Sequence, residues 1–293
     1  MNKKIIFLVI TILLILLIII KIISSNKEGT SFSGENALDL VKTQVEFGPR
    51  IPGSEAHQRT VEFIRTNLQE NGWTVEIQND NNGDYKIQNV IGKSEHAATP
   101  WIILAAHYDS RFFADQDPNI ENHKAPVPGA NDGASGTAIL LELARVIPKG
   151  LEKNIWLVFF DAEDQGNIQN WDWILGSRSF VNQLVGKPDK VVIIDMVGDA
   201  DLNLYYEKNS YPELSKEIWD VAIQNGFDKN FIPQYKFNIL DDHIPFINKG
   251  IKAIDIIDFD YPYWHTLNDT SDKVSPESLY AVGQTLCQWL LTK

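Results

Sequence analysis

The sequence predicts an α/β fold, a single three-layer α/β sandwich around a mostly parallel, mixed central sheet. Short, continuous apolar runs predict buried strands, and segments with apolar residues at helical spacing alternate with them. Four such runs form the expected centre of the sheet, at residues 101–106, 155–160, 191–194 and 251–257.

The remaining elements follow from the same patterns. Helices are expected at 35–45 and 55–71, on either side of a turn-rich segment containing Pro and Gly. Two further strands are expected at 74–78 and 86–91. Later helices are expected at 135–147, 211–225 and 276–291. With no internal repeat or second domain boundary in the sequence, we expect one domain over residues 35–293.

An apolar leader precedes this domain. Residues 5–20 carry no charge, and a snorkelling Lys21 would extend the apolar stretch to residue 23, roughly the length of a membrane span. We therefore expect residues 1–26 to be a signal-anchor, or alternatively a cleaved signal peptide, followed by a polar linker at 27–34. Either assignment places the domain in the cell envelope, on the periplasmic or extracellular side. In the first case residues 5–23 anchor it in the membrane.

Composition excludes some functions. The formal net charge is −13. Because residues 1–30 hold four Lys and one Glu, the rest of the chain carries −16. Such an acidic surface offers no basic footprint for nucleic acid. The lone cysteine, Cys287, lies in an apolar helical pattern and is expected to be a small buried hydrophobe, not a nucleophile.

Polar residues follow four of the predicted strands. In open α/β sheets, residues just beyond the carboxyl ends of the strands converge on the ligand site. We therefore expect one site that combines the endings of these strands. The residues are His107, Asp109, Asp161, Glu163, Asp164, Asp195 and His265.

Three residues form a candidate metal site. Asp132 stands among small residues just before a predicted helix, Asp164 is one of two adjacent carboxylates, and His265 follows the last strand region. Two carboxylates and one imidazole suit zinc with an open fourth position. The neighbouring Glu163 would remain free to act as a base.

The sequence leaves the roles of other histidines and acids open. His107, Asp109 and Asp195 would supply a second ion or act as hydrogen-bond partners around the first, and their spacing leaves both alternatives open. Three further histidines lie in polar helix or loop sequence and are expected at the surface. They are His57, His96 and His123.

As a set, these motifs resemble the zinc aminopeptidase-like (M28-type) superfamily, from residue 47 to the final helix. Within it, three features look like the glutaminyl cyclase branch. They are the segment at 241–246, Trp264 directly before His265, and the long stretch after Asp164 that holds Trp171 and Trp173.

The resemblance implies a role for each matching residue. Asp132, Asp164 and His265 would bind one zinc ion, although Asp164 departs from the Glu more usual at that position. Glu163 would be the proton shuttle. Asp195 and Asp241 would form an acidic relay, and Trp264 and Trp171 would line the substrate pocket. His107 and Asp109 stay available for a second ion or for hydrogen bonding.

The implied reaction is cyclisation of an N-terminal glutaminyl residue of a peptide or protein to pyroglutamate, with release of ammonia. The resemblance thus implies an acyltransferase of the aminoacyltransferase class. The alternative is an M28-type metallo-aminopeptidase with two zinc ions, in which His107 and Asp195 are ligands and Asp132 bridges. A binding module on an inactive scaffold is a third reading, but no candidate ligand is missing here.

Overall fold

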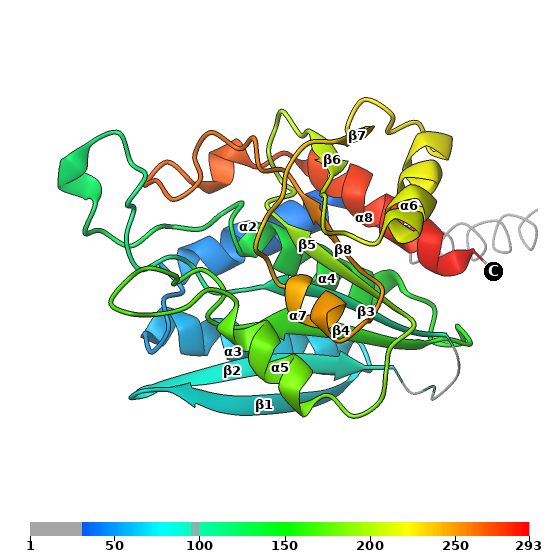
Figure 1. Ribbon diagram of the computed structural model, residues 1–293, viewed down its shortest axis with the longest axis horizontal. Helices are drawn as coiled ribbons and strands as arrows, with labels where there is room; N and C mark the ends of the chain where they lie inside the picture. The colour runs from blue at the N-terminus through cyan, green and yellow to red at the C-terminus, as the bar shows by residue number, and fades with distance from the viewer. Residues whose placement is uncertain (1–30, 95, 97–99, 293) are drawn as a thin grey trace, which may run out of the picture.

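A six-stranded mixed sheet forms the centre of the protein (Figure 1). The computed structural model describes residues 31–94, 96 and 100–292. The strands lie in the order β1-β2-β4-β3-β5-β8. The pairs β1–β2 and β2–β4 are antiparallel, whereas β4, β3, β5 and β8 run parallel to one another. The six strands are β1 (Thr74–Asn82), β2 (Tyr85–Lys93), β3 (Trp101–His107), β4 (Asn154–Phe160), β5 (Lys190–Asp195) and β8 (Ala253–Ile257).

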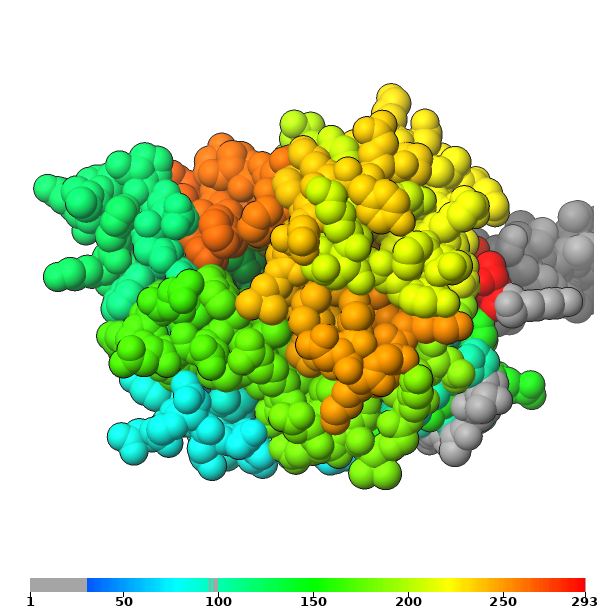
Figure 2. Space-filling view, in the orientation of Figure 1, coloured from blue at the N-terminus to red at the C-terminus, as the bar shows by residue number. Residues whose placement is uncertain are grey.

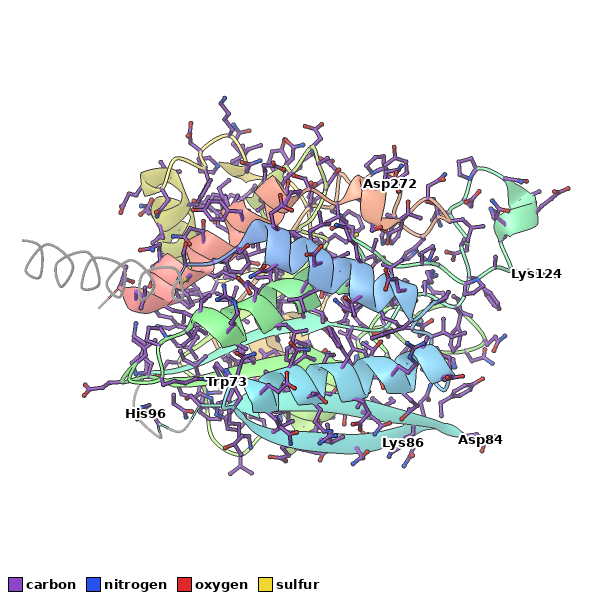
Figure 3. All side chains as sticks on the ribbon, turned by 180° about the vertical axis from the view of Figure 1, so that it is seen from behind. Trp73, Asp84, Lys86, His96, Lys124 and Asp272 are labelled. Carbon is purple, nitrogen blue, oxygen red and sulfur yellow. The ribbon has the colours of Figure 1, made fainter. Side chains whose placement is uncertain are left out.

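Helices cover both faces of this sheet. On one face lie α2 (Gly34–Glu46), α3 (Glu55–Glu70), α4 (Ala134–Val146), α6 (Pro212–Gln224) and α8 (Pro276–Leu291). Figure 3, seen from behind, shows α2 and α3 in front. The opposite face carries the shorter α5 (Leu175–Gln183) and α7 (Ile244–Asn248).

Alternation along β3 shows how the strands serve both layers. Ile102 and Leu104 belong to the core beneath the larger helical layer, and Ile103 and Ala105 belong to the core beneath α5 and α7. Successive side chains of a strand point to opposite faces, so a strand buried on both sides is apolar throughout. The predicted three-layer sandwich is therefore confirmed.

Most predicted elements agree with the structure to within a few residues at their ends. The prediction omitted α5, α7, two 3₁₀ turns and a separate two-stranded parallel sheet. The omitted strands are β6 (Leu204–Tyr206) and β7 (Phe231–Tyr235), and the turns are η1 (Ile120–Asn122) and η2 (Ser271–Lys273). These elements are short, and periodicity is a weak signal over so few residues. Cys287 is buried, as expected.

One histidine prediction is wrong. His57 was expected at the surface, but its side chain, which belongs to α3, is completely buried. Its Nε2 lies 2.8 Å from Oδ1 of Asp161 and 3.1 Å from the hydroxyl of Tyr108. The polar sequence of α3 concealed this position, because His57 faces polar partners at the ends of β3 and β4 instead of an apolar core.

The predicted leader lies outside the described residues, and so does most of the linker. Among the residues that the structure does describe, no helix is long and apolar enough to cross a membrane.

Close packing of α4 on the sheet positions the loop that carries Asp132. A Cβ atom at Gly136 would come within 2.2 Å of the carbonyl oxygen of Ile194 and 2.9 Å of the Ala106 Cβ. A glycine therefore lets the start of α4 approach the ends of β3 and β5.

We predict that Gly136→Ala destabilises the domain by about 1–3 kcal/mol, because α4 must move away from the sheet. Urea unfolding measures this free energy. Gly150→Ala is the matched control, since a Cβ there meets no heavy atom within 4 Å and its φ is not positive. Equal losses at the two positions would contradict the packing argument.

Candidate active site

The predicted site residues meet at one edge of the sheet. Asp195 ends β5, and Glu163 and Asp164 follow β4. Asp132 precedes α4, and His265 follows β8. Because β3, β4, β5 and β8 are parallel, their carboxyl ends lie side by side. Residues distant in the sequence are thereby brought together.

The expected metal ligands form a compact buried group. Nε2 of His265 lies 2.8 Å from Oδ1 of Asp164 and 3.7 Å from Oδ2 of Asp132. One ligand atom from each of the three residues lies within 4.8 Å of the others. The second oxygens, Oδ2 of Asp132 and of Asp164, have no hydrogen-bond partner among the described residues. Two carboxylates and an imidazole, with buried oxygens that accept no hydrogen bond from the described chain, fit a zinc ion.

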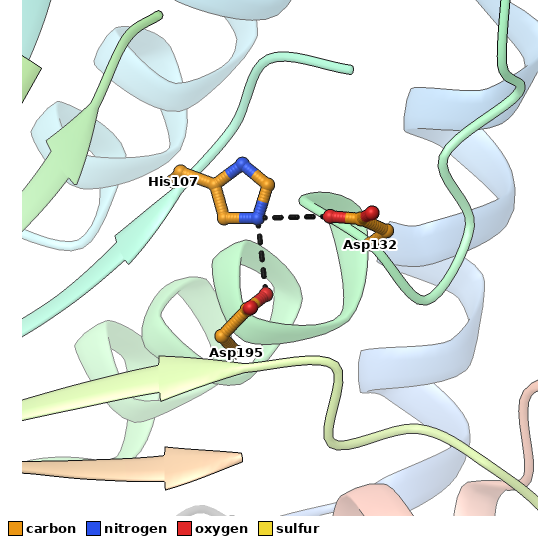
Figure 4. Close-up of side chains that lie close together, drawn as sticks. All are labelled: His107, Asp132 and Asp195. Carbon is orange, nitrogen blue, oxygen red and sulfur yellow. Dashed lines mark hydrogen bonds and ion pairs between the residues drawn. The ribbon is translucent and has the colours of Figure 1, made fainter. Parts of the chain in front are cut away.

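A second group shares Asp132. Figure 4 shows Nε2 of His107 facing two carboxylates, 3.2 Å from Oδ1 of Asp132 and 3.0 Å from Oδ1 of Asp195. These three residues also satisfy the distance condition for a metal group. The two groups could hold two ions bridged by Asp132, or one ion with His107 as a hydrogen-bonding neighbour.

Asp109 has a different position. Its oxygens accept hydrogen bonds from the backbone N–H groups of Glu163 at 3.1 Å and Asp164 at 3.3 Å, and from the Gln165 side chain at 2.9 Å. Of the two roles left open by the sequence, these contacts correspond to hydrogen-bonding support. Asp109 orients the loop that presents both acids.

The Asp132 loop is supported in a similar way. Asp269 accepts hydrogen bonds from the backbone N–H groups of Asn131 at 2.8 Å and Asp132 at 3.2 Å. Arg50, fully buried, donates to the carbonyl oxygens of Tyr108 and Pro128 at 2.9 and 2.8 Å. The Arg50 guanidinium places a positive charge among these acids.

A cavity of about 240 Å³ opens beside the ligand group. Its acidic lining includes Glu163, Asp195 and Asp241 in addition to two of the ligands. Figure 2 shows a hollow at the surface between the green segment after β4 and the orange segment after β8. The apolar and amide lining consists of Trp173, Met196, Asn238, Ile239, Leu240, Ile257, Phe259 and Trp264.

Burial shifts the pKa values of the acids in and beside this cavity. The pKa of Glu163 is raised well above its ordinary value, because burial disfavours the charged form and Asp241 and Asp164 add negative charge. Burial likewise raises the pKa of Asp195 to about 7. For Asp132, burial acts in the same direction, but its hydrogen bond to His107 and the charges of the histidines outweigh it and lower the pKa.

The tryptophans divide between the cavity and the interior. Trp264 lines the cavity and stacks on His265, with ring centroids 3.7 Å apart. Trp171, expected in the pocket, is instead buried in a small apolar cluster against Tyr85 and Phe112. Its neighbour Trp173 lines the cavity. The turn-rich stretch at 164–170 precedes Trp171, and the chain then continues past Trp173 into α5.

The backbone is strained next to several site residues. Non-glycine residues have positive φ at Ala162, Met196 and His265, with values of 53°, 45° and 56°. Ala162 precedes Glu163, and Met196 follows Asp195. Such conformations persist where surrounding contacts hold them, and they often accompany functional sites.

Behind the cavity lies a third buried group, consisting of Asp241, His243 and Asp255. Nε2 of His243 lies 3.1 Å from Glu207, and Nδ1 lies 3.9 Å from Asp255. The pKa of Asp255 is raised well above its ordinary value by burial and by the charge of Asp241. Asp255 therefore has Asp241 of the cavity wall and Glu207 as acidic neighbours.

Sequence reasoning missed Arg111 and Asp115. Both lie next to the ligands, and Arg111 is almost completely buried. Their spacing of four residues is typical of an ion pair on a helix, but here the segment is a loop, so the spacing alone gave no reason to place them at the site.

Known proteins resemble this chain over most of its length. The sequence profile of peptidase family M28 matches residues 89–290. Glutaminyl-peptide cyclotransferase of Bos taurus is 25% identical over 309 aligned residues, covering 90% of this chain and 83% of the bovine one.

Solved structures agree with that similarity. Tannerella forsythia glutaminyl cyclase has a TM-score of 0.84 and 35% identity, over 90% of this chain and 99% of its own. A Zn-dependent exopeptidase from Parabacteroides distasonis has a TM-score of 0.86 and 31% identity, over 90% of this chain and 100% of its own. The chain therefore belongs to peptidase family M28, with glutaminyl cyclases among its relatives.

Proposed function

We propose that this protein is a zinc-dependent glutaminyl-peptide cyclotransferase. Its substrates are peptides or proteins with N-terminal Gln. In the reaction, the substrate's α-amine nitrogen forms a bond to the carbonyl carbon of its own side-chain amide. The bond from that carbon to the amide nitrogen breaks, which yields pyroglutamate and ammonia.

The observation that carries this proposal is the position of Glu163. It lines a small cavity directly beside the Asp132–Asp164–His265 group without belonging to that group. The cavity of about 240 Å³ lies below the roughly 300–1,000 Å³ of ordinary ligand pockets. It suits one compact side chain curled onto its own amine, and its open mouth leaves the rest of a peptide outside. Cyclases among the relatives support the same reaction.

Asp132, Asp164 and His265 are the residues that would hold one zinc ion. A bound zinc ion would polarise the side-chain carbonyl and stabilise negative charge developing on its oxygen. The ligand atoms already lie close together, and Oδ2 of Asp132 and of Asp164 have no hydrogen-bond partner among the described residues.

Glu163 would move the proton. As a base it takes a proton from the substrate's α-ammonium group, and as an acid it returns one to the departing ammonia. The elevated pKa of Glu163 suits a carboxyl group that alternates between these forms. Asp195 and Asp241 line the same cavity and would form the acidic relay around Glu163.

The aromatic walls would orient the substrate. Trp264 and Trp173 offer flat apolar faces on which the compact ring of the product can pack, with Ile257 and Phe259 nearby. Cyclisation is intramolecular, so the site gains most of its rate by folding the substrate back on itself and excluding water.

A second candidate is a two-zinc aminopeptidase. The group His107–Asp132–Asp195 favours it, because Asp132 could bridge two ions. Against it, Trp264 and Trp173 line and narrow the cavity in which a peptide bond would have to lie across both ions.

We predict that Glu163→Gln keeps one zinc ion per chain but lowers kcat by on the order of 100- to 10,000-fold, because the proton shuttle is lost. Asp132→Ala, Asp164→Ala and His265→Ala should each lose both zinc and activity. Elemental analysis and ammonia release from a Gln-initiated peptide measure the two effects. Asp172→Ala, which removes an exposed acid from the same loop as Glu163, is the control. Two zinc ions per active chain would favour the peptidase.

We predict that Trp264→Ala and Trp173→Ala each lower kcat/KM for Gln-initiated peptides, by on the order of 100-fold, with zinc retained. Trp171→Phe should stay close to wild type, since an aromatic ring still fills the buried cluster against Phe112. The wild-type protein should release no free residue from Leu- or Ala-initiated peptides. Release of free Leu without pyroglutamate formation would overturn the cyclase assignment.

We also propose that residues 5–23 anchor the exported domain to a membrane, on the basis of their uncharged, apolar sequence. The full-length chain should then remain in the membrane fraction after a high-salt wash and be released by detergent. N-terminal sequencing that begins near residue 25, together with a soluble protein, would show a cleaved signal peptide instead.

A further inference from the structure

The loop between β3 and α4 contacts two of the metal-ligand residues, although they come from distant parts of the chain. Asp164 follows β4 and His265 follows β8, whereas the contacting residues are Arg111, Asp115 and their neighbours. The loop continues outward to Lys124 at its tip, well away from the sheet (Figure 3).

Arg111 binds the Asp164 side of the site. Nη1 donates a hydrogen bond of 2.9 Å to the Asp164 carbonyl oxygen and lies 3.6 Å from Oδ1 of the same residue. Nη2 lies 3.3 Å from the carbonyl oxygen of Gly166. The Arg111 side chain is 3% exposed, so water competes little for these contacts. The guanidinium thus holds the backbone that presents Asp164.

Asp115 connects this guanidinium to His265. The Arg111–Asp115 pair is bidentate, with Nε to Oδ1 at 2.8 Å and Nη2 to Oδ2 at 2.7 Å. A bidentate pair fixes orientation as well as distance. Oδ1 of Asp115 also lies 3.5 Å from Nδ1 of His265. This separation is longer than a hydrogen bond, so the attraction is mainly electrostatic.

Two backbone contacts hold the His265 segment from the same loop. The N–H of Gln116 donates to the His265 carbonyl oxygen at 3.2 Å, and Oδ2 of Asp117 accepts from the N–H of Leu267 at 3.0 Å. His265 has a φ of 56°, which costs a non-glycine residue free energy. The two contacts lie at the His265 carbonyl oxygen and two residues further on, and they help to hold that conformation.

This arrangement suits metal binding. When Nε2 of a histidine binds a cation, the ring carries its N–H on Nδ1, and a carboxylate facing Nδ1 favours this orientation. Asp115 faces Nδ1 of His265. Since Arg111 binds both Asp115 and Asp164, one ion pair sets the positions of two ligands relative to each other.

The same guanidinium supports the cavity wall. The Arg111 Cζ lies 4.8 Å from the centre of the Trp173 ring, and Trp173 stacks nearly parallel to His265, at 6.1 Å and 11°. A change at Arg111 is therefore transmitted to substrate binding as well as to the ligands.

We propose that Arg111 and Asp115 are positioning residues that preset the zinc ligands Asp164 and His265. The inference rests on the proposed zinc site, but not on which reaction the site performs. Both residues contribute to zinc affinity, and Arg111 also contributes to substrate affinity through its contact with Trp173.

The test compares three variants with the wild-type chain. Asp115→Ala removes the charge, Asp115→Asn removes it while keeping the shape, and Arg111→Lys keeps the charge but loses the bidentate geometry. Glu121→Ala, an exposed acid on the same loop, is the matched control. Each protein is stripped of metal, and its zinc dissociation constant is measured by competition with a chelator. Unfolding of the metal-free form and kcat and KM of the zinc-loaded form are also measured.

We expect Asp115→Ala and Arg111→Lys to weaken zinc binding by on the order of 10- to 100-fold, as for other partners of metal ligands. Asp115→Asn should lose less. Arg111→Lys should in addition raise KM, whereas Asp115→Ala should act mainly on zinc. The control should match wild type.

Zinc dissociation constants within twofold of wild type would overturn the proposal, even if the metal-free variants were less stable. Should Asp115→Ala fail to fold, Asp115→Asn decides by the same criterion. A further outcome is that the variants bind zinc more weakly than the wild type while the zinc-loaded wild type forms no pyroglutamate. That result would refute the proposed function and leave the positioning role of Arg111 and Asp115 intact.

Discussion

The site depends on burying several carboxylates side by side where parallel strands end. Asp109, Asp132, Asp164, Glu163 and Asp195 all have little exposed surface. Removing a charged group from water costs several kcal/mol, so each buried acid needs hydrogen bonds, a cation or a proton. Backbone N–H groups, two histidines and two arginines supply part of this compensation. Oδ2 of Asp132 and Oδ2 of Asp164 still lack a hydrogen-bond donor in the part of the chain that the structure describes. A divalent cation between them would compensate their negative charge. The way the fold gathers acids thus creates a place suited to a metal ion.

The same constraint accounts for the rigid surroundings of the site. Residues with positive φ stand beside or at functional positions, as at Ala162, Met196 and His265. Each such residue costs on the order of 1–3 kcal/mol. The two apolar layers on either face of the sheet stabilise the domain enough to maintain them. Hydrogen bonds of Asp109 and Arg50 with nearby backbone groups then hold the loops that carry the site residues. The free energy gained by burying the two apolar layers thus offsets the cost of the strained residues, which hold the site side chains at the strand ends in place.

Prediction from the sequence succeeded where the signal was periodic. The buried parallel strands are continuous apolar runs, and the helices of the larger layer have apolar residues at helical spacing. Prediction failed where a residue's environment comes from another segment. His57 lies in a polar-looking helix, yet Asp161 and Tyr108 enclose it. Trp171 and Trp173 are two residues apart, and only the turns between Gln165 and Ile174 decide which of them reaches the cavity.

The sequence by itself determined the α/β class, the order of the strands along the chain and the acids and histidine that the strand ends present. These features are local, because hydrophobic periodicity and residue chemistry are properties of short segments. Only the tertiary structure decided that Asp132, Asp164 and His265 converge, that Asp109 supports the acidic loop, and that Arg111 with Asp115 lies between two of the ligands. These relations join segments up to about 150 residues apart, as the bond from Leu267 to Asp117 illustrates. They arise from sheet order and loop packing, which depend on contacts that no single segment encodes.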